Sequence, residues 1–101
     1  MGRKPRIPGH LSPESKAIWA DIEANWDLDG HSRTILQVSL EAFDQMRTAQ
    51  ELVSKVGLVF KTKSGQIKLN PAVQAVKVAR SQFLHSWKML NLGGEPPEGG
   101  K

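Results

Sequence analysis

Apolar residues recur every three or four positions in three stretches of the chain, which is the spacing of one face of an α-helix. In the first stretch they are Ile18, Trp19, Ile22 and Trp26. Ser12 precedes this stretch as a typical N-cap residue and Pro13 suits the first helical position. The sequence DLDG at residues 27–30 then breaks the pattern. These signals predict a first helix that begins after Ser12.

The second stretch predicts a helix that is long for a chain of 101 residues. It begins at His31 or Ser32 and ends at Val56, because Gly57 is a typical residue after a helix C-terminus. At 1.5 Å per residue it would be about 38 Å long, more than a domain of this size needs for its own core. Its apolar residues lie on more than one face, which indicates more than one neighbour.

We therefore expect a homo-oligomer larger than a dimer, held together by this long helix. A small domain without cysteine has no disulfide to supplement a modest core, which makes a partner chain more useful to it. The expected interface residues are Leu36, Leu40, Phe43, Met46 and Val53.

A β-hairpin is predicted between the second and third helices, at about residues 58–69. Gly65 follows Ser64 in its turn and can take the positive φ that tight hairpin turns require. Asn70 and Pro71 repeat the cap-then-proline signal and start the third helix. A lone two-stranded hairpin is marginal in water, so we expect it to lean on a helix or a neighbouring subunit.

The predicted fold class is therefore mainly α, with three helices and one short hairpin in a single domain. The helical domain covers residues 11–92. A basic arm rich in proline and glycine precedes it at residues 1–10, and a glycine- and proline-rich tail follows at residues 93–101. We expect both the arm and the tail to be flexible.

Charge is segregated along the chain, whose formal net charge is +4. Residues 11–29 are mostly acidic, whereas no acidic residue lies between Glu51 and Glu95. The basic residues in this acid-free stretch are Lys55, Lys61, Lys63, Lys68, Lys77, Arg80 and Lys88. Such segregation suits a polyanionic partner such as nucleic acid, and a solvated surface without a partner is the other interpretation.

Candidate catalytic and metal-binding residues are scarce. His10, His31 and His85 lack metal-ligand spacing, and no carboxylate cluster accompanies them. The glycine-rich end does not match a phosphate-binding loop, because Glu95 stands where a glycine is required. We therefore expect no enzyme activity, no cofactor and no metal. The apolar runs are far shorter than the roughly 20 residues that cross a bilayer, so no membrane contact is expected.

Three short motifs occur in an order that resembles a known family. They are GLVF at residues 57–60, KLNP at residues 68–71 and L-x-L-G-G-x-P-P at residues 90–97. Together with the tryptophan-anchored first helix, they resemble the short small terminase subunits of tailed bacteriophages. Such subunits are encoded beside a large terminase ATPase and often an HNH nuclease. The resemblance covers residues 8–97.

The resemblance implies a non-catalytic DNA-packaging factor that forms a ring oligomer in the host cytoplasm. It would bind double-stranded viral DNA and recruit and stimulate the large terminase subunit. Relatives of other lineages carry a separate N-terminal helix-turn-helix domain, for which there is no room ahead of this helical core. We therefore expect weakly sequence-selective binding through a basic ring surface.

The expected DNA-binding residues lie on the hairpin, on the third helix and on the N-terminal arm. They are Lys61, Lys63, Lys68, Lys77 and Arg80, helped by Arg3, Lys4 and Arg6. In a ring, a projecting hairpin would repeat its lysines many times, so that weak phosphate contacts act together. Lysines that only protect exposed strand edges are the other interpretation.

Two other functions are compatible with parts of the sequence. One is a helix-turn-helix transcription regulator, in which Ser32, Arg33, Thr34 and Gln37 would enter the major groove. Its first helix would then place acidic residues against the phosphate backbone, which opposes this function. The other is a protein–protein adaptor without DNA contact. The number of subunits in solution discriminates best among the three.

Overall fold

The computed structural model describes residues 6–92 of the chain. In chain order the elements are α1 (Pro13–Asn25), α2 (Gly30–Val56), β1 (Val59–Lys61), β2 (Ile67–Leu69) and α3 (Pro71–Leu90). The predicted fold class, three helices with a short hairpin between the second and third, is thus confirmed. The predicted tail and the first half of the predicted arm lie outside the described residues.

The helix ends are set by the local signals that the sequence carries. The Ser12 side chain accepts a hydrogen bond from the Ser15 amide at the start of α1. Asp29 caps α2 by accepting from the Ser32 amide, so that α2 begins at Gly30, slightly before the expected His31 or Ser32. Gly57 ends α2 with φ of 95°, a backbone conformation that favours glycine.

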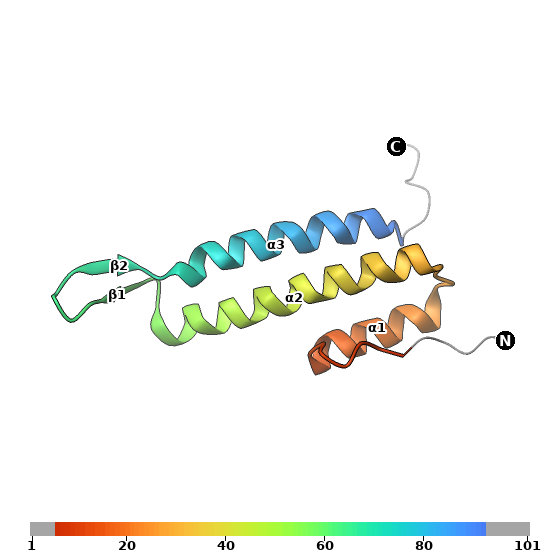
Figure 1. The fold of residues 1–101 in the computed structure, drawn as a ribbon, viewed down its shortest axis with the longest axis horizontal. Helices are drawn as coiled ribbons and strands as arrows, with labels where there is room; N and C mark the ends of the chain where they lie inside the picture. The colour runs from red at the N-terminus through yellow and green to blue at the C-terminus, as the bar shows by residue number, and fades with distance from the viewer. Residues whose placement is uncertain (1–5, 93–101) are drawn as a thin grey trace.

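The three helices lie in one layer (Figure 1). α2 and α3 run antiparallel and side by side, and the hairpin connects them at one end (Figure 1). α1 folds back along the first half of α2, at the end of the molecule away from the hairpin (Figure 1). The Cα radius of gyration is 17.7 Å, whereas a compact domain of 100 residues has about 13 Å. The chain is therefore elongated, and α1 does not reach the hairpin half of the α2–α3 pair (Figure 1).

The apolar core lies at the α1 end of the molecule. Its buried residues are Leu11, Trp19, Ile22, Leu28, Leu36, Leu40 and Leu90. Towards the hairpin, the buried residues of the α2–α3 pair are smaller or more flexible, namely Ala42, Met46, Ala49, Ala72 and Ala79. Alanine allows two helices to approach closely but removes little apolar surface from water. Most of the hydrophobic stabilisation is therefore concentrated at one end.

The structure revises the predicted oligomer interface. Leu36 and Leu40 have no exposed surface and pack within the core of the single chain, and Met46 is 9% exposed. A neighbouring copy could not reach Leu36 or Leu40, because α1 and α3 already cover this part of α2. Phe43 and Val53 are half-buried and keep surface for a partner.

The last residues of the predicted arm contact the helical domain. Ile7 packs against the core, and the His10 ring nitrogen Nε2 lies 2.6 Å from Glu41 Oε2 on α2. Residues 7–10 are therefore attached to the helical domain. An apolar residue within a basic, proline-rich stretch is the signal that indicates this attachment.

Candidate nucleic-acid interface

The hairpin projects from the helices and touches neither of their faces along its strands. Every residue of β1 and β2 is exposed. The expected support from a helix is thus absent in the single chain, which leaves only a neighbouring subunit as a possible support. The hairpin extends the α2–α3 pair along its long direction and ends farthest from α1 (Figure 1).

Asn70 fastens the root of the hairpin to both helices. Its amide N–H donates to the Leu58 carbonyl oxygen at 2.7 Å, and its side-chain Nδ2 donates to the Gly57 carbonyl oxygen at 2.9 Å. Its Oδ1 accepts from the Ala72 amide at 3.0 Å, which caps α3. The side chain donates and accepts at once, which a carboxylate of the same shape could not do. Asn70 therefore sets the direction in which the hairpin leaves the helices.

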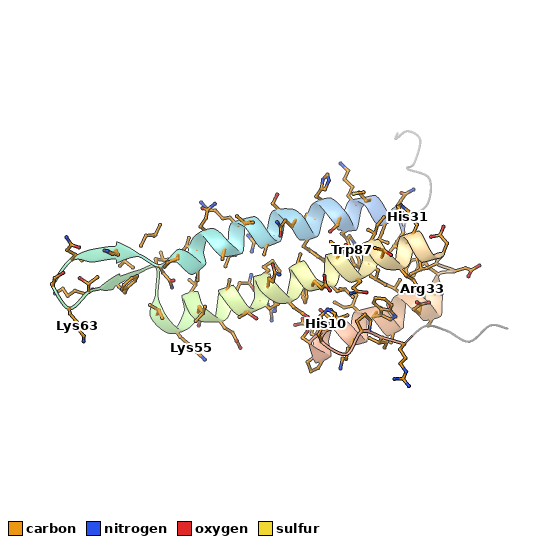
Figure 2. All side chains as sticks on the ribbon, viewed as in Figure 1. His10, His31, Arg33, Lys55, Lys63 and Trp87 are labelled. Atoms are coloured by element: carbon orange, nitrogen blue, oxygen red, sulfur yellow. The ribbon has the colours of Figure 1, made fainter. Side chains whose placement is uncertain are left out.

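The turn at the hairpin tip is closed by its own hydrogen bonds. The Thr62 amide donates to the Gln66 carbonyl oxygen at 2.8 Å, and the Gly65 amide donates to the Thr62 carbonyl oxygen at 2.9 Å. Gly65 has φ of 91°, as expected for its place in the turn. Lys63 extends from this tip into solvent (Figure 2).

The strand register distributes the lysines over both faces of the hairpin. Lys61 lies opposite Ile67, and Phe60 lies opposite Lys68. Directly opposed residues share a face and consecutive residues alternate, so Lys61 and Lys68 point to opposite faces. With Lys63 at the tip, the predicted lysines surround the end of the hairpin. Val59, Ile67 and Leu69 share the Lys61 face, and Phe60 lies opposite Lys68 on the other face.

The predicted basic residues of α3 lie behind the hairpin. Lys77 and Arg80 are exposed, and helical spacing places Lys77 on the same edge of α3 as Leu84 and Lys88. Within residues 6–92, no carboxylate forms an ion pair with the lysines of the hairpin or with these basic residues of α3. They are therefore available to an external anion.

Lys55 is a further exposed basic residue near the hairpin and was not among the expected DNA-binding residues. It is exposed in the last turn of α2 and points away from α3, on the side where α1 no longer covers α2 (Figure 2). Its position in the acid-free stretch is the signal that indicates its place near the other exposed basic residues. Of the expected arm residues, Arg6 is exposed, and Arg3 and Lys4 lie outside the described residues.

The opposite end of the molecule is acidic and internally paired. Arg33 Nε donates to Glu23 Oε2 at 2.7 Å, and this hydrogen bond raises the pKa of Arg33. A groove of about 700 Å³ between the start of α1 and α2 is lined by Glu14, Asp44 and Glu51 together with His10 and Arg47. Its carboxylates disfavour phosphate groups. The α1 end is therefore a poor surface for nucleic acid.

Asp44 ties the start of α1 to the middle of α2. Its Oδ1 accepts hydrogen bonds from the hydroxyl groups of Ser12 and Ser15, both at 2.6 Å, and its Oδ2 accepts from the Ser12 amide at 2.8 Å. Burial raises the pKa of this carboxyl, but the hydrogen bonds to its charged form outweigh that effect and the pKa is lowered. Asp44 thus stays ionised and holds α1 in place.

The geometry disfavours a helix-turn-helix regulator. In that motif two helices cross at a steep angle, whereas α1 lies alongside α2 (Figure 1). The side chains expected in the major groove also have partners within the chain. Arg33 pairs with Glu23, Gln37 donates to Glu41, and the Thr34 hydroxyl donates to the Gly30 carbonyl oxygen.

Over residues 6–92, no three His, Cys, Asp or Glu side chains gather closely enough to hold a metal ion. None of α1, α2 and α3 combines the length and the apolar character that a membrane span requires.

A family model described as phage terminase, small subunit, matches residues 14–93. The chain belongs to this family. The match takes in the three helices and the hairpin, so it rests on the whole of the domain described above. Comparisons with curated proteins and with solved structures gave no match. Membership of the small terminase subunit family links the chain to phage DNA packaging.

Proposed function

We propose that this small terminase subunit is a non-catalytic DNA-packaging factor that binds double-stranded viral DNA. In the host cytoplasm it recruits the large terminase subunit and stimulates that subunit's activity. The observation that carries the proposal is the separation of charge in space. The half of the chain that bears the hairpin is basic and exposed, whereas the half that bears α1 is acidic.

The hairpin is the main DNA contact in this proposal. Lys61, Lys63 and Lys68 surround its end, and Lys77 and Arg80 extend the basic surface along α3. One subunit offers only a few phosphate contacts, which bind weakly at physiological salt. A ring of subunits repeats them, so that the contacts act together with a high effective concentration.

Such contacts read the phosphate backbone and give little sequence selectivity. The basic side chains sit on a small turn and on a helix edge, and no helix is presented to a major groove. Specificity for the packaging start then comes from another component, and the large terminase subunit supplies the ATPase and the nuclease.

The test compares two triple variants that remove the same charge from different places. One is Lys61→Ala, Lys63→Ala and Lys68→Ala on the hairpin, and the control is Arg3→Ala, Lys4→Ala and Arg6→Ala in the arm. Fluorescence anisotropy with a labelled duplex gives the affinity at several salt concentrations. The logarithm of the affinity falls by about 0.9 per phosphate contact for each tenfold rise in salt, so the slope counts contacts.

We expect the hairpin variant to flatten this slope and the arm variant to change it less. The reverse result would place the main DNA contact on the arm. Wild-type binding that is absent or independent of salt would favour an adaptor that does not touch DNA. Tight binding of one operator sequence by an isolated dimer would favour a transcription regulator.

A further inference from the structure

Two neighbouring grooves run along one broad face of the α2–α3 pair. The first, about 630 Å³, lies near the hairpin between Leu52 of α2 and Ala75 of α3. The second, about 450 Å³, lies nearer the core end between Val38 and Met89. Gln45 lines both grooves, so they belong to one continuous surface. We call this surface the groove face.

The groove face exposes large apolar side chains along its whole length. Val38 is 50% exposed, Leu52 is 48% exposed and Met89 is 55% exposed. Helical spacing adds Val56 after Leu52 and Val78 after Ala75, and both are also exposed. An extended apolar patch on a small chain marks an interaction surface more often than scattered apolar residues do.

The groove face is nearly free of available charge, although the chain is basic. Neither groove is lined by a lysine or an arginine. Its acidic residues already have partners, because Asp44 accepts from Ser12 and Ser15, and Glu41 accepts from Gln37 and lies against His10. Within residues 6–92, His85 is the one basic side chain that lines either groove, so this surface offers a polyanion little to bind and is distinct from the hairpin lysines.

We infer that the groove face is covered by a second copy of this chain. This rests on the proposed function, in which subunits form a ring. α3 is about 30 Å long, and two helices side by side, each about 10 Å in diameter, are about 20 Å wide, so the face measures roughly 600 Å². Specific interfaces bury about 800 Å² on each partner. The groove face thus supplies most of the area that a stable subunit contact needs.

The contact is heterologous, meaning that the groove face meets a different surface of the next copy. A closed ring requires such a contact. The opposite broad face carries Phe43 and Trp87. Phe43 is two residues from Gln45 of the groove face, and Trp87 is two residues from Met89, which in each helix corresponds to a rotation of about 200°. Phe43 contacts Phe83, which in turn contacts Trp87, with ring centroids 5.4 Å apart in both pairs. This row of half-buried rings is the matching apolar surface.

When subunits stack through their broad faces, the outer edge of α3 stays exposed. Lys77 and Lys88 lie on the outer edge of α3, away from the groove face, and the hairpin extends beyond the end of the helices. Each added subunit would therefore leave the hairpin and this edge exposed, whereas Arg80, seven residues before Trp87 and so on the same face of α3, would lie at the subunit contact. The interface and the DNA contact can be tested separately for that reason.

The test introduces a single lysine in each of three variants, two on the groove face and one outside it. Met89→Lys and Leu52→Lys place an ammonium group on the groove face. Leu84→Lys is the matched control, because Leu84 also lies in α3, is 56% exposed against 55% for Met89, and belongs to the outer edge. Light scattering coupled to size exclusion gives the mass, and circular dichroism checks that each variant is folded.

We expect wild type and Leu84→Lys to have the same oligomeric mass, and Met89→Lys and Leu52→Lys to shift to smaller species. An oligomer that survives both groove-face substitutions would overturn the inference while leaving the ring intact. A monomeric wild type would contradict the ring of the proposed function itself. If wild type is monomeric and Met89→Lys abolishes capture by the purified large subunit, the groove face belongs to that partner instead.

Discussion

The two ends of this molecule are built on different principles. At the α1 end, large side chains such as Trp19 and Leu40 are almost completely buried, and acidic groups are paired with hydrogen-bond donors. At the hairpin end, buried positions of the helix pair hold mainly alanine, and the strands are exposed on both faces. Stability is concentrated at one end, and the exposed basic hairpin lies at the other.

This division explains how a small chain can carry an exposed basic element. A hairpin that contributes little to folding can vary its side chains for binding without loss of the fold. The long helices connect the two ends mechanically, because α2 begins in the core and ends at the root of the hairpin. Each prediction below changes one end, and three of them take a matched substitution elsewhere in the chain as the control.

The largest difference is expected between two leucines. Leu40 is fully buried, whereas Leu69 of β2 is 61% exposed. Leu40→Ala should lower the free energy of unfolding by about 2–5 kcal/mol, through lost burial and a cavity. Leu69→Ala should lower it by less than about 1 kcal/mol. Urea denaturation measures both, and similar losses would show that the hairpin is buried against another chain.

Asp44→Asn should have the next largest effect. The asparagine side chain cannot accept all three hydrogen bonds in the same way, so we expect a loss of about 1–3 kcal/mol near neutral pH. Glu51→Gln, an exposed change on the same helix, should stay within about 0.5 kcal/mol. Thermal unfolding of wild type and of both variants provides the measurement.

The pH dependence of the Asp44 effect has a definite sign. The pKa of Asp44 is lowered in the folded chain from its ordinary value of 3.8. Its stabilising contribution is therefore fully present above that ordinary value and is lost as the pH falls through the lowered pKa. The difference between wild type and Asp44→Asn should shrink below about pH 4. A difference that grows on acidification would contradict the role of the ionised carboxylate.

Local signals in the sequence predicted the elements and their order. Ser12, Asn70 and the prolines that follow them mark helix starts, and Gly57 and Gly65 mark positions where the backbone needs positive φ. These signals act within a few residues, so they can be read without knowledge of the fold. The exposure of the hairpin lysines followed from the same reasoning, whereas their DNA contact remains a prediction.

The assignment of apolar residues to core or interface could not be predicted in the same way. Leu40 and Leu52 both lie on α2 among regularly spaced apolar residues, but α1 covers only the first half of that helix. Which half is covered depends on the contact of Ser12 with Asp44, which are 32 residues apart. Helical spacing contains no information about such a distant pairing.

The two glycines at the ends of α2 offer a matched backbone test. Gly57 has φ of 95°, whereas Gly30 has an ordinary helical conformation with open space around it. Gly57→Ala should cost about 1–2 kcal/mol, because an alanine rarely adopts this conformation. Gly30→Ala should be neutral or stabilise by less than about 1 kcal/mol. Equal losses of unfolding free energy in urea denaturation would show that the positive φ of Gly57 does not require glycine at the root of the hairpin.

The smallest effect on stability is expected from the hairpin lysines. Replacing Lys61, Lys63 and Lys68 with alanine should change the free energy of unfolding by less than about 0.5 kcal/mol, because they are exposed and pair with no carboxylate of residues 6–92. The sign should depend on salt. At low salt the three like charges repel one another, so their removal should be neutral or slightly stabilising, and salt should screen this difference. Thermal unfolding at two salt concentrations measures it. A clear loss of stability would mean that the lysines have partners in the assembled protein, so that the hairpin end would also contribute to stability.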